Sequence, residues 1–172
     1  MREVADADRI TRFMRAFGAA APVEATCYLT GGATAVLVGW RATTIDVDIA
    51  FEPDADELLL ELPRLKNALS INVELASPGD FIPLPEGWRD RSPFVASEGR
   101  VTFRHFDPTS QALAKLERGH DRDLDDVHAL MAAGLVEKRA LQAAYDEIEP
   151  LLYRFPAVDP RAFRRRVEQI TE

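Results

Sequence analysis

The sequence predicts an α/β fold of the α+β type, in which a small mixed sheet flanked by helices is followed by a helical C-terminal part. Between residues 1 and 106, short strand-like segments alternate with segments of helical periodicity, whereas only helical patterns occur after Pro108. Residues 45–49 alternate apolar and acidic side chains, which is typical of a half-buried strand. We therefore expect an α/β domain over residues 1–106, a helical part over residues 107–172 packed on it, and a ligand cleft between the two.

The composition indicates a soluble globular protein with a substantial core. Hydrophobic residues make up 47% of the 172 residues, and charged residues make up 29%. The single cysteine, Cys27, excludes a disulfide within the chain and predicts a reducing, cytoplasmic setting. We expect neither a signal peptide nor a membrane segment, because the longest apolar run, Ala33 to Trp40, is too short to span a bilayer. The net charge of −8 disfavours nucleic acid unless a local basic patch binds it.

The spacing of apolar residues predicts two helices and a strand in the first part of the chain. Four apolar residues at helical spacing predict an amphipathic helix over residues 6–20: Ile10, Phe13, Met14 and Phe17. A strand at Glu24–Thr30 runs into the pair Gly31-Gly32. The segment Ala33–Val38 is apolar on all sides, so we expect a buried helix that ends at Gly39.

The segment Ile45–Phe51 predicts the acid-bearing strand. Side chains alternate across a strand, so Asp46 and Asp48 share one face. The other face is expected to hold Ile45, Val47 and Ile49.

The middle of the chain predicts a helix in two pieces, one strand and a hairpin. Leucines at helical spacing follow Pro53-Asp54, and we expect a break at Pro63, which would open the second piece, because proline removes a helical hydrogen bond. Ile71–Leu75 predicts a third strand, and a loop follows it. A hairpin turning at Glu98-Gly99 is expected to pair two strands, Phe94–Ser97 and Arg100–Phe106.

The remaining residues predict four helices. Glycines separate the first three, and Asp159-Pro160 supplies a cap and a first-turn proline for the last. Their expected bounds are Pro108–Arg118, Arg122–Ala133, Glu137–Tyr153 and Pro160–Ile170.

Two motifs in the first half suggest phosphate chemistry. Gly31-Gly32 precedes a helix, so its backbone N–H groups suit a phosphate, although glycines in this place are more often explained by a tight turn that needs positive φ. Asp46 and Asp48 suit a divalent metal, or form the polar face of an exposed strand. If the strand that holds Glu74 neighbours theirs, three carboxylates lie on one face, as a two-metal site requires; Glu74 is otherwise an edge-strand glutamate.

Charged residues in the helical part offer further candidates. Lys115 lies beside an apolar stripe, and either reaches a triphosphate or snorkels to solvent. Asp123 falls on the core-facing side of its helix, so it is either paired at a site, with Arg118 or Arg122, or forms a capping box with Asp126. A cluster of arginines near the C-terminus is either an RNA contact or a solvated basic face: Arg161, Arg164, Arg165 and Arg166.

These motifs, in their order along residues 28–135, resemble the polymerase-β-like nucleotidyltransferase superfamily. The likeness is carried by Gly31-Gly32, then Arg41-x-x-Thr44-x-Asp46-x-Asp48, then Glu74 as the third acid. Within the superfamily the chain is most similar to bacterial abortive-infection and toxin–antitoxin nucleotidyltransferases. These carry a later Lys-Leu pair and an Arg-Asp-x-x-Asp helix, which correspond here to Lys115-Leu116 and to residues 122–126.

The resemblance implies Mg²⁺- or Mn²⁺-dependent transfer of a nucleoside monophosphate from a nucleoside triphosphate such as ATP to a hydroxyl acceptor. It implies three metal ligands, Asp46, Asp48 and Glu74, with Lys115 and Asp123 as further catalytic residues. The residues implied in nucleotide binding are Gly31, Gly32, Thr34, Arg41, Thr44, Lys115 and Arg122.

The acceptor in that toxin group is typically tRNA, which implies a toxin–antitoxin enzyme acting on RNA. Modification of a partner protein by an antitoxin-type enzyme, and a catalytically inactive nucleotide- or partner-binding module, stay open as alternatives. Two positions depart from the family pattern. Ala33 stands where a serine or threonine often supplies a hydroxyl, for which Thr34 or Thr30 could substitute, and Glu74 replaces the commoner aspartate.

Overall fold

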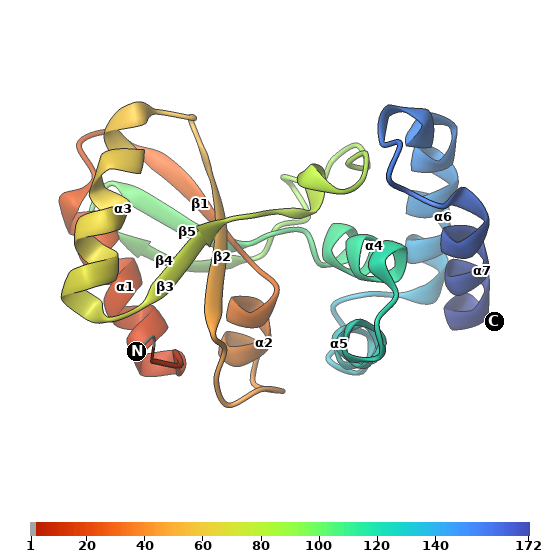
Figure 1. The fold of residues 1–172 in the computed structure, drawn as a ribbon, viewed down its shortest axis with the longest axis horizontal. Coiled ribbons are helices and arrows are strands. Elements are labelled where there is room, and N and C mark those ends of the chain that lie inside the picture. The colour runs from red at the N-terminus through yellow and green to blue at the C-terminus, as the bar shows by residue number, and fades with distance from the viewer. Residues whose placement is uncertain (1–2) are drawn as a thin grey trace. The chain divides into compact units, whose positions relative to one another are not determined.

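The structure is a computed structural model that describes residues 3–172, and the chain divides into two units. The sheet unit consists of Met1–Ala76 and Ser92–His105, of which the first two residues lie outside the described part. The helical unit consists of Ser77–Arg91 and Phe106–Glu172. The predicted fold class is confirmed: a mixed sheet flanked by helices accompanies a helical C-terminal region (Figure 1).

The five-stranded sheet has the order β3-β2-β1-β5-β4. Its strands are β1 (Ala25–Thr30), β2 (Asp46–Glu52), β3 (Asn72–Leu75), β4 (Phe94–Glu98) and β5 (Val101–His105). Strand β1 is antiparallel to β2 and parallel to β5, and β2 is parallel to β3. Strands β4 and β5 form the predicted hairpin. The strands expected at Glu24–Thr30 and Ile71–Leu75 are thus confirmed to within one residue.

Three helices cover one face of the sheet: α1 (Ala7–Ala20), α2 (Gly32–Val38) and α3 (Asp56–Leu69). The side chain of Asp6 caps α1 by accepting from the N–H of Arg9 at 2.8 Å. The predicted apolar stripe of α1 is buried, and Figure 1 shows α1 beside α3 on the sheet. Apolar residues of all three helices and of the facing strands therefore form one core.

Two expectations about buried apolar residues were wrong. Ile45 does not face the core with Val47 and Ile49; it is 61% exposed because β2 begins only at Asp46, and alternation holds only within the strand. Helix α2 is not buried on all sides, because Val38 in its last turn is 39% exposed.

The expected break at Pro63 was also wrong. Helix α3 runs without interruption through Pro63 and begins at Asp56, not at Pro53-Asp54. Leu58 and Leu62 before the proline and Leu65 after it are all buried in the same core. Packing on both sides of Pro63 therefore outweighs the cost of the hydrogen bond that proline cannot make.

The helical unit contains η1 (Pro78–Asp80), α4 (Pro108–Arg118), α5 (Asp121–Ala132), α6 (Lys138–Ile148), η2 (Glu149–Arg154) and α7 (Pro160–Thr171). The predicted cap of the last helix is confirmed, since the Asp159 carboxylate accepts from the N–H groups of Arg161 and Ala162. The helix expected over Glu137–Tyr153 ends earlier, at Ile148. Pro150 lies in the 3₁₀ segment that follows. Because proline has no N–H, it could not donate the hydrogen bond that an α-helix running through residue 150 would need.

The segment Ser77–Arg91 is bound to α4 within the helical unit. Asp107, which caps α4, is fully buried and accepts from Arg91 Nη2 at 2.9 Å. The ring of Trp88 stacks on Phe106, with centroids 4.5 Å apart. Within residues 3–172, no helix combines the length and the apolar character that crossing a membrane requires.

Candidate active site

The Gly31-Gly32 turn lies directly against the acid-bearing strand. Gly31 adopts φ +59°, and a Cβ there would lie 3.2 Å from Oδ2 of Asp48. A Cβ on Gly32 would collide with the hydroxyl of Thr44, which donates to the carbonyl of Asp46 at 2.9 Å. Both glycines are therefore needed locally, one for its conformation and one for close packing.

The acids of β2 and β3 lie on the same face of the sheet. The parallel register pairs Asp46 with Asn72 and Asp48 with Glu74. Burial along β2 alternates, with Val47, Ile49 and Phe51 in the core and the aspartates half-buried on the other face. The condition set from the sequence is met, because β2 and β3 are neighbours, so Asp46, Asp48 and Glu74 share one face.

Asn72 joins two of these acids, a contact that sequence reasoning missed. Its amide nitrogen donates to Oδ1 of Asp46 and, at 3.1 Å, to Oε1 of Glu74. The residue is only 2% exposed. The signal was present in the alternation of Asn72 and Glu74 along β3, which predicts that both face the same way as the aspartates.

The chemistry of this donor set fits a hard divalent cation. Carboxylate oxygens are the ligands that Mg²⁺ prefers, and it commonly uses one or two carboxylates together with substrate phosphates. In the described part of the chain, no three Asp, Glu, His or Cys side chains are arranged so that they could share one ion. Asp46 and Asp48 of β2 offer such a pair of carboxylates for one ion, and Asn72 bonds one oxygen of Asp46 and one oxygen of Glu74.

Behind the glycine turn, Thr34 is held in the interior. It is fully buried, and its hydroxyl donates to the carbonyl of Leu29 at 3.2 Å and lies 3.0 Å from Nδ1 of His105. Burial lowers the pKa of His105 to about 4, so the imidazole is neutral near pH 7. The Thr34 hydroxyl therefore bonds α2 to β1 and β5 and does not point to solvent.

Thr30, at the end of β1, pairs with Asp48 and is 7% exposed. Arg41 is half-buried after α2.

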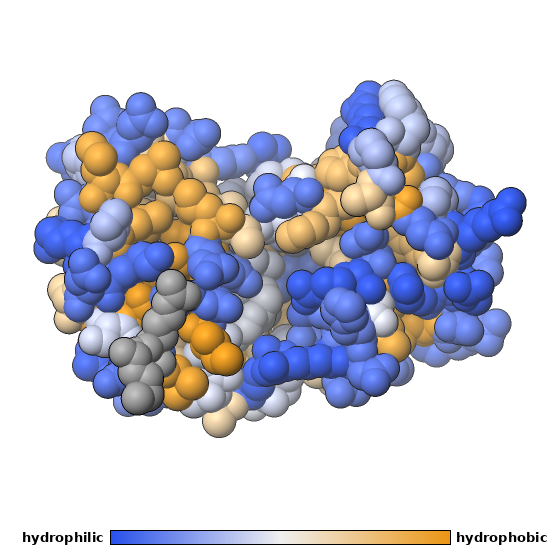
Figure 2. Space-filling view, in the orientation of Figure 1, coloured by the Kyte–Doolittle hydropathy of each residue, from blue (hydrophilic) through white to orange (hydrophobic). Residues whose placement is uncertain are grey.

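A groove of about 600 Å³ lies between α3 and the edge strand β3. Its walls are Leu59, Leu62, Pro63, Lys66, Asn67, Val73, Glu74 and Leu75. Figure 2 shows hydrophobic residues gathered over α3. Leu60 of α3 is 76% exposed, and Leu75 of β3 is 53% exposed. Glu74 belongs both to this groove and to the acid-bearing face.

In the helical unit, Lys115 is paired with buried carboxylates. Its Nζ lies 2.7 Å from Oδ2 of Asp126 and 3.8 Å from Oδ1 of Asp123, and the Lys115 side chain is 12% exposed. Arg118 donates to both oxygens of Asp123, at 2.8 and 2.5 Å. The snorkelling alternative for Lys115 is therefore excluded, and the partner of Asp123 is Arg118. Arg122 is exposed on α5.

Asp123 also caps α5, but not in the way expected. The predicted box between Asp123 and Asp126 was wrong, because the carboxylate of Asp123 accepts from the N–H of His120 at 3.2 Å, one position before the helix. Burial alone would raise the pKa of Asp123. The hydrogen bond and charge of Arg118, the charge of Lys115 and the His120 N–H outweigh burial, so this pKa lies below its usual 3.8.

The C-terminal arginines divide into two kinds. Arg164 pairs with Glu149, and Arg166 donates to the carbonyls of Leu116 and Glu117 at the end of α4. Arg161 and Arg165 are exposed.

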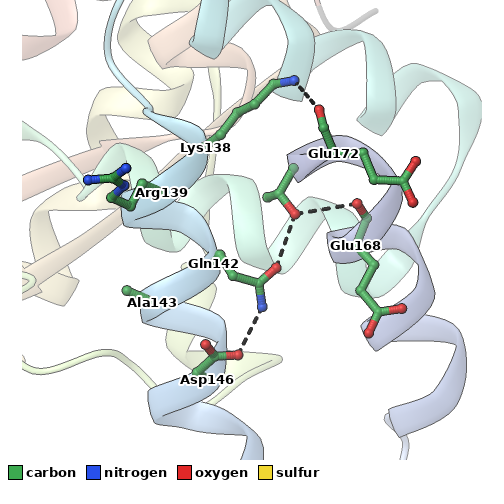
Figure 3. Close-up of a pocket in the computed structure, with 8 residues that line it drawn as sticks. Lys138, Arg139, Gln142, Ala143, Asp146, Glu168 and Glu172 are labelled. Carbon is green, nitrogen blue, oxygen red and sulfur yellow. Dashed lines mark hydrogen bonds between the residues drawn. The ribbon is translucent and has the colours of Figure 1, made fainter.

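A polar hollow between α6 and α7 is lined in part by Lys138, Gln142 and Thr171 (Figure 3). Its polar groups bond one another, as when Thr171 donates to Gln142 at 3.0 Å, so it resembles a helix–helix contact more than a ligand site.

The structure brings the glycine turn, Thr44 and the three predicted acids together in the sheet unit. It brings Lys115 and Asp123 together in the helical unit. A family model described as "Nucleotidyltransferase of unknown function (DUF6036)" matches residues 9–172. Neither curated proteins nor solved structures gave a significant match. Because the family match covers almost all of the sequence, the chain belongs to this nucleotidyltransferase family.

Proposed function

We propose that the protein is a Mg²⁺- or Mn²⁺-dependent enzyme that transfers a nucleoside monophosphate from a nucleoside triphosphate to a hydroxyl acceptor. One observation carries the proposal: β2 and β3 pair in a register that sets Glu74 opposite Asp48, beside the Gly31 turn. Acids on neighbouring strands next to a side-chain-free turn suit a metal-bound triphosphate.

Asp46 and Asp48 would hold one ion, and Glu74 would complete a second metal site. When bound, the ion would neutralise phosphate charge and lower the pKa of the attacking hydroxyl. Gly31 and Gly32 would cradle the β- and γ-phosphates, since neither has a side chain of its own to hold a phosphate away from the backbone. Thr44 holds this turn against β2 through its bond to the Asp46 carbonyl.

The reaction is an in-line displacement at the α-phosphorus. The Glu74 carboxylate takes the proton of the acceptor hydroxyl, whose oxygen forms the new bond to phosphorus. The bond between the α-phosphorus and the bridging oxygen breaks, and pyrophosphate leaves. The role of Lys115 in neutralising the triphosphate, with Asp123 to orient it, stays a prediction from the sequence.

For the acceptor we propose RNA, tRNA in the first instance, within a toxin–antitoxin system. The exposed Arg161 and Arg165 on α7 support contact with a phosphate backbone. The net charge of −8 favours the second candidate, a partner protein that receives the nucleotide.

One labelling experiment separates these acceptors. The protein is incubated with Mg²⁺ and each nucleoside triphosphate in turn, labelled at the α-phosphate, together with total tRNA or with cell lysate. Label on RNA supports the first acceptor, and label on a protein supports the second. If nothing is labelled and calorimetry detects no Mg²⁺-dependent binding of any nucleoside triphosphate, the enzyme proposal fails.

A further inference from the structure

Asn72 lies within the candidate active site, but the proposed reaction assigns it no role. It is 2% exposed and pairs with Asp46 in the parallel register of β2 and β3. Glu74 follows two positions later on the same strand, so both side chains point to the acid-bearing face.

The contacts of Asn72 define which end of its amide faces the acids. An ionised carboxylate can only accept hydrogen bonds, so the group between Asp46 and Glu74 must be the NH₂ and not the carbonyl. This NH₂ has two hydrogens, and its two acceptors are Oδ1 of Asp46 and Oε1 of Glu74. One neutral group thus joins carboxylates that belong to two different strands.

This bridge limits how the two carboxylates can turn. Like charges on adjacent strands repel, and without a shared donor the two side chains would move apart. The bridge uses one oxygen of each acid, and each carboxylate keeps its second oxygen. Groups that hydrogen-bond to metal-binding carboxylates orient them, and removing such a group typically weakens metal binding.

We propose that Asn72 is a positioning residue for the metal: its NH₂ holds Asp46 and Glu74 so that their second oxygens are directed for binding a divalent cation. The proposal rests on the proposed function, because it assumes that these acids bind the ion. It adds a residue that would never touch the reacting atoms but that sets the affinity for the ion before any nucleotide arrives.

The test measures metal binding in nucleotide-free protein. Mn²⁺ and Mg²⁺ are titrated calorimetrically into the unchanged protein, Asn72→Ala and the control Asn67→Ala, at a temperature well below every melting temperature. Asn67 is an exposed asparagine on α3, so the control removes the same chemical group outside the bridge. We expect Asn72→Ala to bind the ion about 10- to 100-fold more weakly, and Asn67→Ala to bind it normally.

A second variant examines the same bridge by a different route. Asn72→Asp replaces the shared donor with a fourth acid directly opposite Asp46, so we expect a lower melting temperature without metal. Added Mn²⁺ should then raise its melting temperature by more than it raises that of the unchanged protein. If Asn72→Ala does not fold, Asn72→Ser keeps one donor and should show an intermediate loss of affinity.

The outcomes separate this proposal from the function on which it rests. Unchanged metal affinity in a folded Asn72→Ala or Asn72→Ser variant overturns the role of Asn72 and leaves the proposed function standing. If the melting temperature drops while metal affinity stays equal, Asn72 is merely structural, which also overturns the proposal. If the unchanged protein binds neither ion, alone or with a nucleoside triphosphate, the proposed function fails as well.

Discussion

Asp48 lies where three features of the sheet unit meet. Glu74 faces it from β3, Thr30 faces it from β1, and Gly31 approaches its carboxylate so closely that a Cβ would lie 3.2 Å away. A change at this residue alters the charge of the acid-bearing face and the contact with the glycine turn together. The proposed function therefore rests, at the residue scale, on a few short contacts that single substitutions can remove.

In the helical unit, one substitution at Asp123 removes such contacts. Asp123→Asn keeps a side-chain oxygen that can accept from the His120 N–H, but it loses the charge that binds Arg118 and faces Lys115. Arg118 is 55% exposed and can rehydrate, so we expect a near-normal melting temperature and loss of nucleotidyl transfer. The measurement is a labelling assay beside thermal unfolding. Full activity in the variant would show that Asp123 is a cap and nothing more.

His105 predicts a measurable dependence of stability on pH. Its pKa is about 4 in the folded chain, below the ordinary 6.5, so the unfolded chain binds the proton first as the pH falls. The contribution of His105 is complete above pH 6.5 and is lost as the pH falls from 6.5 towards 4. We expect the unchanged protein to lose about 2 kcal/mol more than His105→Gln between about pH 7 and about pH 5. Urea unfolding measures this; equal losses in the two proteins would refute it.

At the scale of elements, periodicity predicted nearly every helix and strand, because burial on one face imposes a repeat that the sequence must carry. It failed where tertiary packing, or the exact end of a strand, decides which residues are helical or buried. The core contacts of Leu58, Leu62 and Leu65 keep α3 continuous through Pro63, and these contacts are not visible in local sequence. Likewise, Ile45 has the right spacing for the core but precedes the first residue of β2.

Helix α3 should become more stable when Pro63 is replaced. Pro63→Ala restores the missing backbone hydrogen bond and removes the clash of the ring with the preceding turn, so we expect a gain of about 1–3 kcal/mol. Pro156→Ala, at an exposed proline in a turn outside any helix, is the control and should give no gain. Urea unfolding midpoints report the difference. A Pro63→Ala variant no more stable than the parent would mean that α3 depends on the proline.

The same limits decide which parts of the candidate site could be predicted from the sequence. The face that Asp46 and Asp48 share was predictable from their spacing, because side chains alternate along a strand. Glu74 joins them because β3 pairs with β2, which the sequence left as a condition. Hydrogen-bond partners from other elements were not, since Asn72 reaches Asp46 across 26 positions of the chain and His105 reaches Thr34 across 71. Arg118 was one of two candidates for Asp123, and only the three-dimensional contact chose between them.

At the scale of the whole molecule, the two units do not follow one break in the sequence. Ser77–Arg91 precedes the β4–β5 hairpin in the chain but belongs to the helical unit, where Arg91 binds Asp107 and Trp88 stacks on Phe106. The hairpin returns to the sheet unit, and β5 pairs there with β1. The helical unit therefore depends on a segment distant from its helices in sequence.

This dependence can be tested with two fragments. In the first, residues 77–91 are joined by a short glycine–serine linker to residues 106–172; the second is residues 106–172 alone. We expect the first to melt at a higher temperature, because Asp107 keeps its ion pair and Phe106 keeps its stacking partner. Thermal unfolding followed by circular dichroism makes the comparison. Equal melting temperatures would show that the segment 77–91 contributes nothing to the helical unit.

We propose above all that Asp46 and Asp48 bind a nucleoside triphosphate through a divalent metal. Isothermal calorimetry of nucleoside triphosphate binding, with Mg²⁺ and with a chelator, tests it on the unchanged protein, Asp46→Ala, Asp48→Ala and the exposed control Asp54→Ala. We predict Mg²⁺-dependent binding in the unchanged protein and in the control, and its loss in folded Asp46→Ala and Asp48→Ala. Binding that persists in the chelator, or that survives both substitutions, would contradict the metal assignment and with it the proposed mechanism.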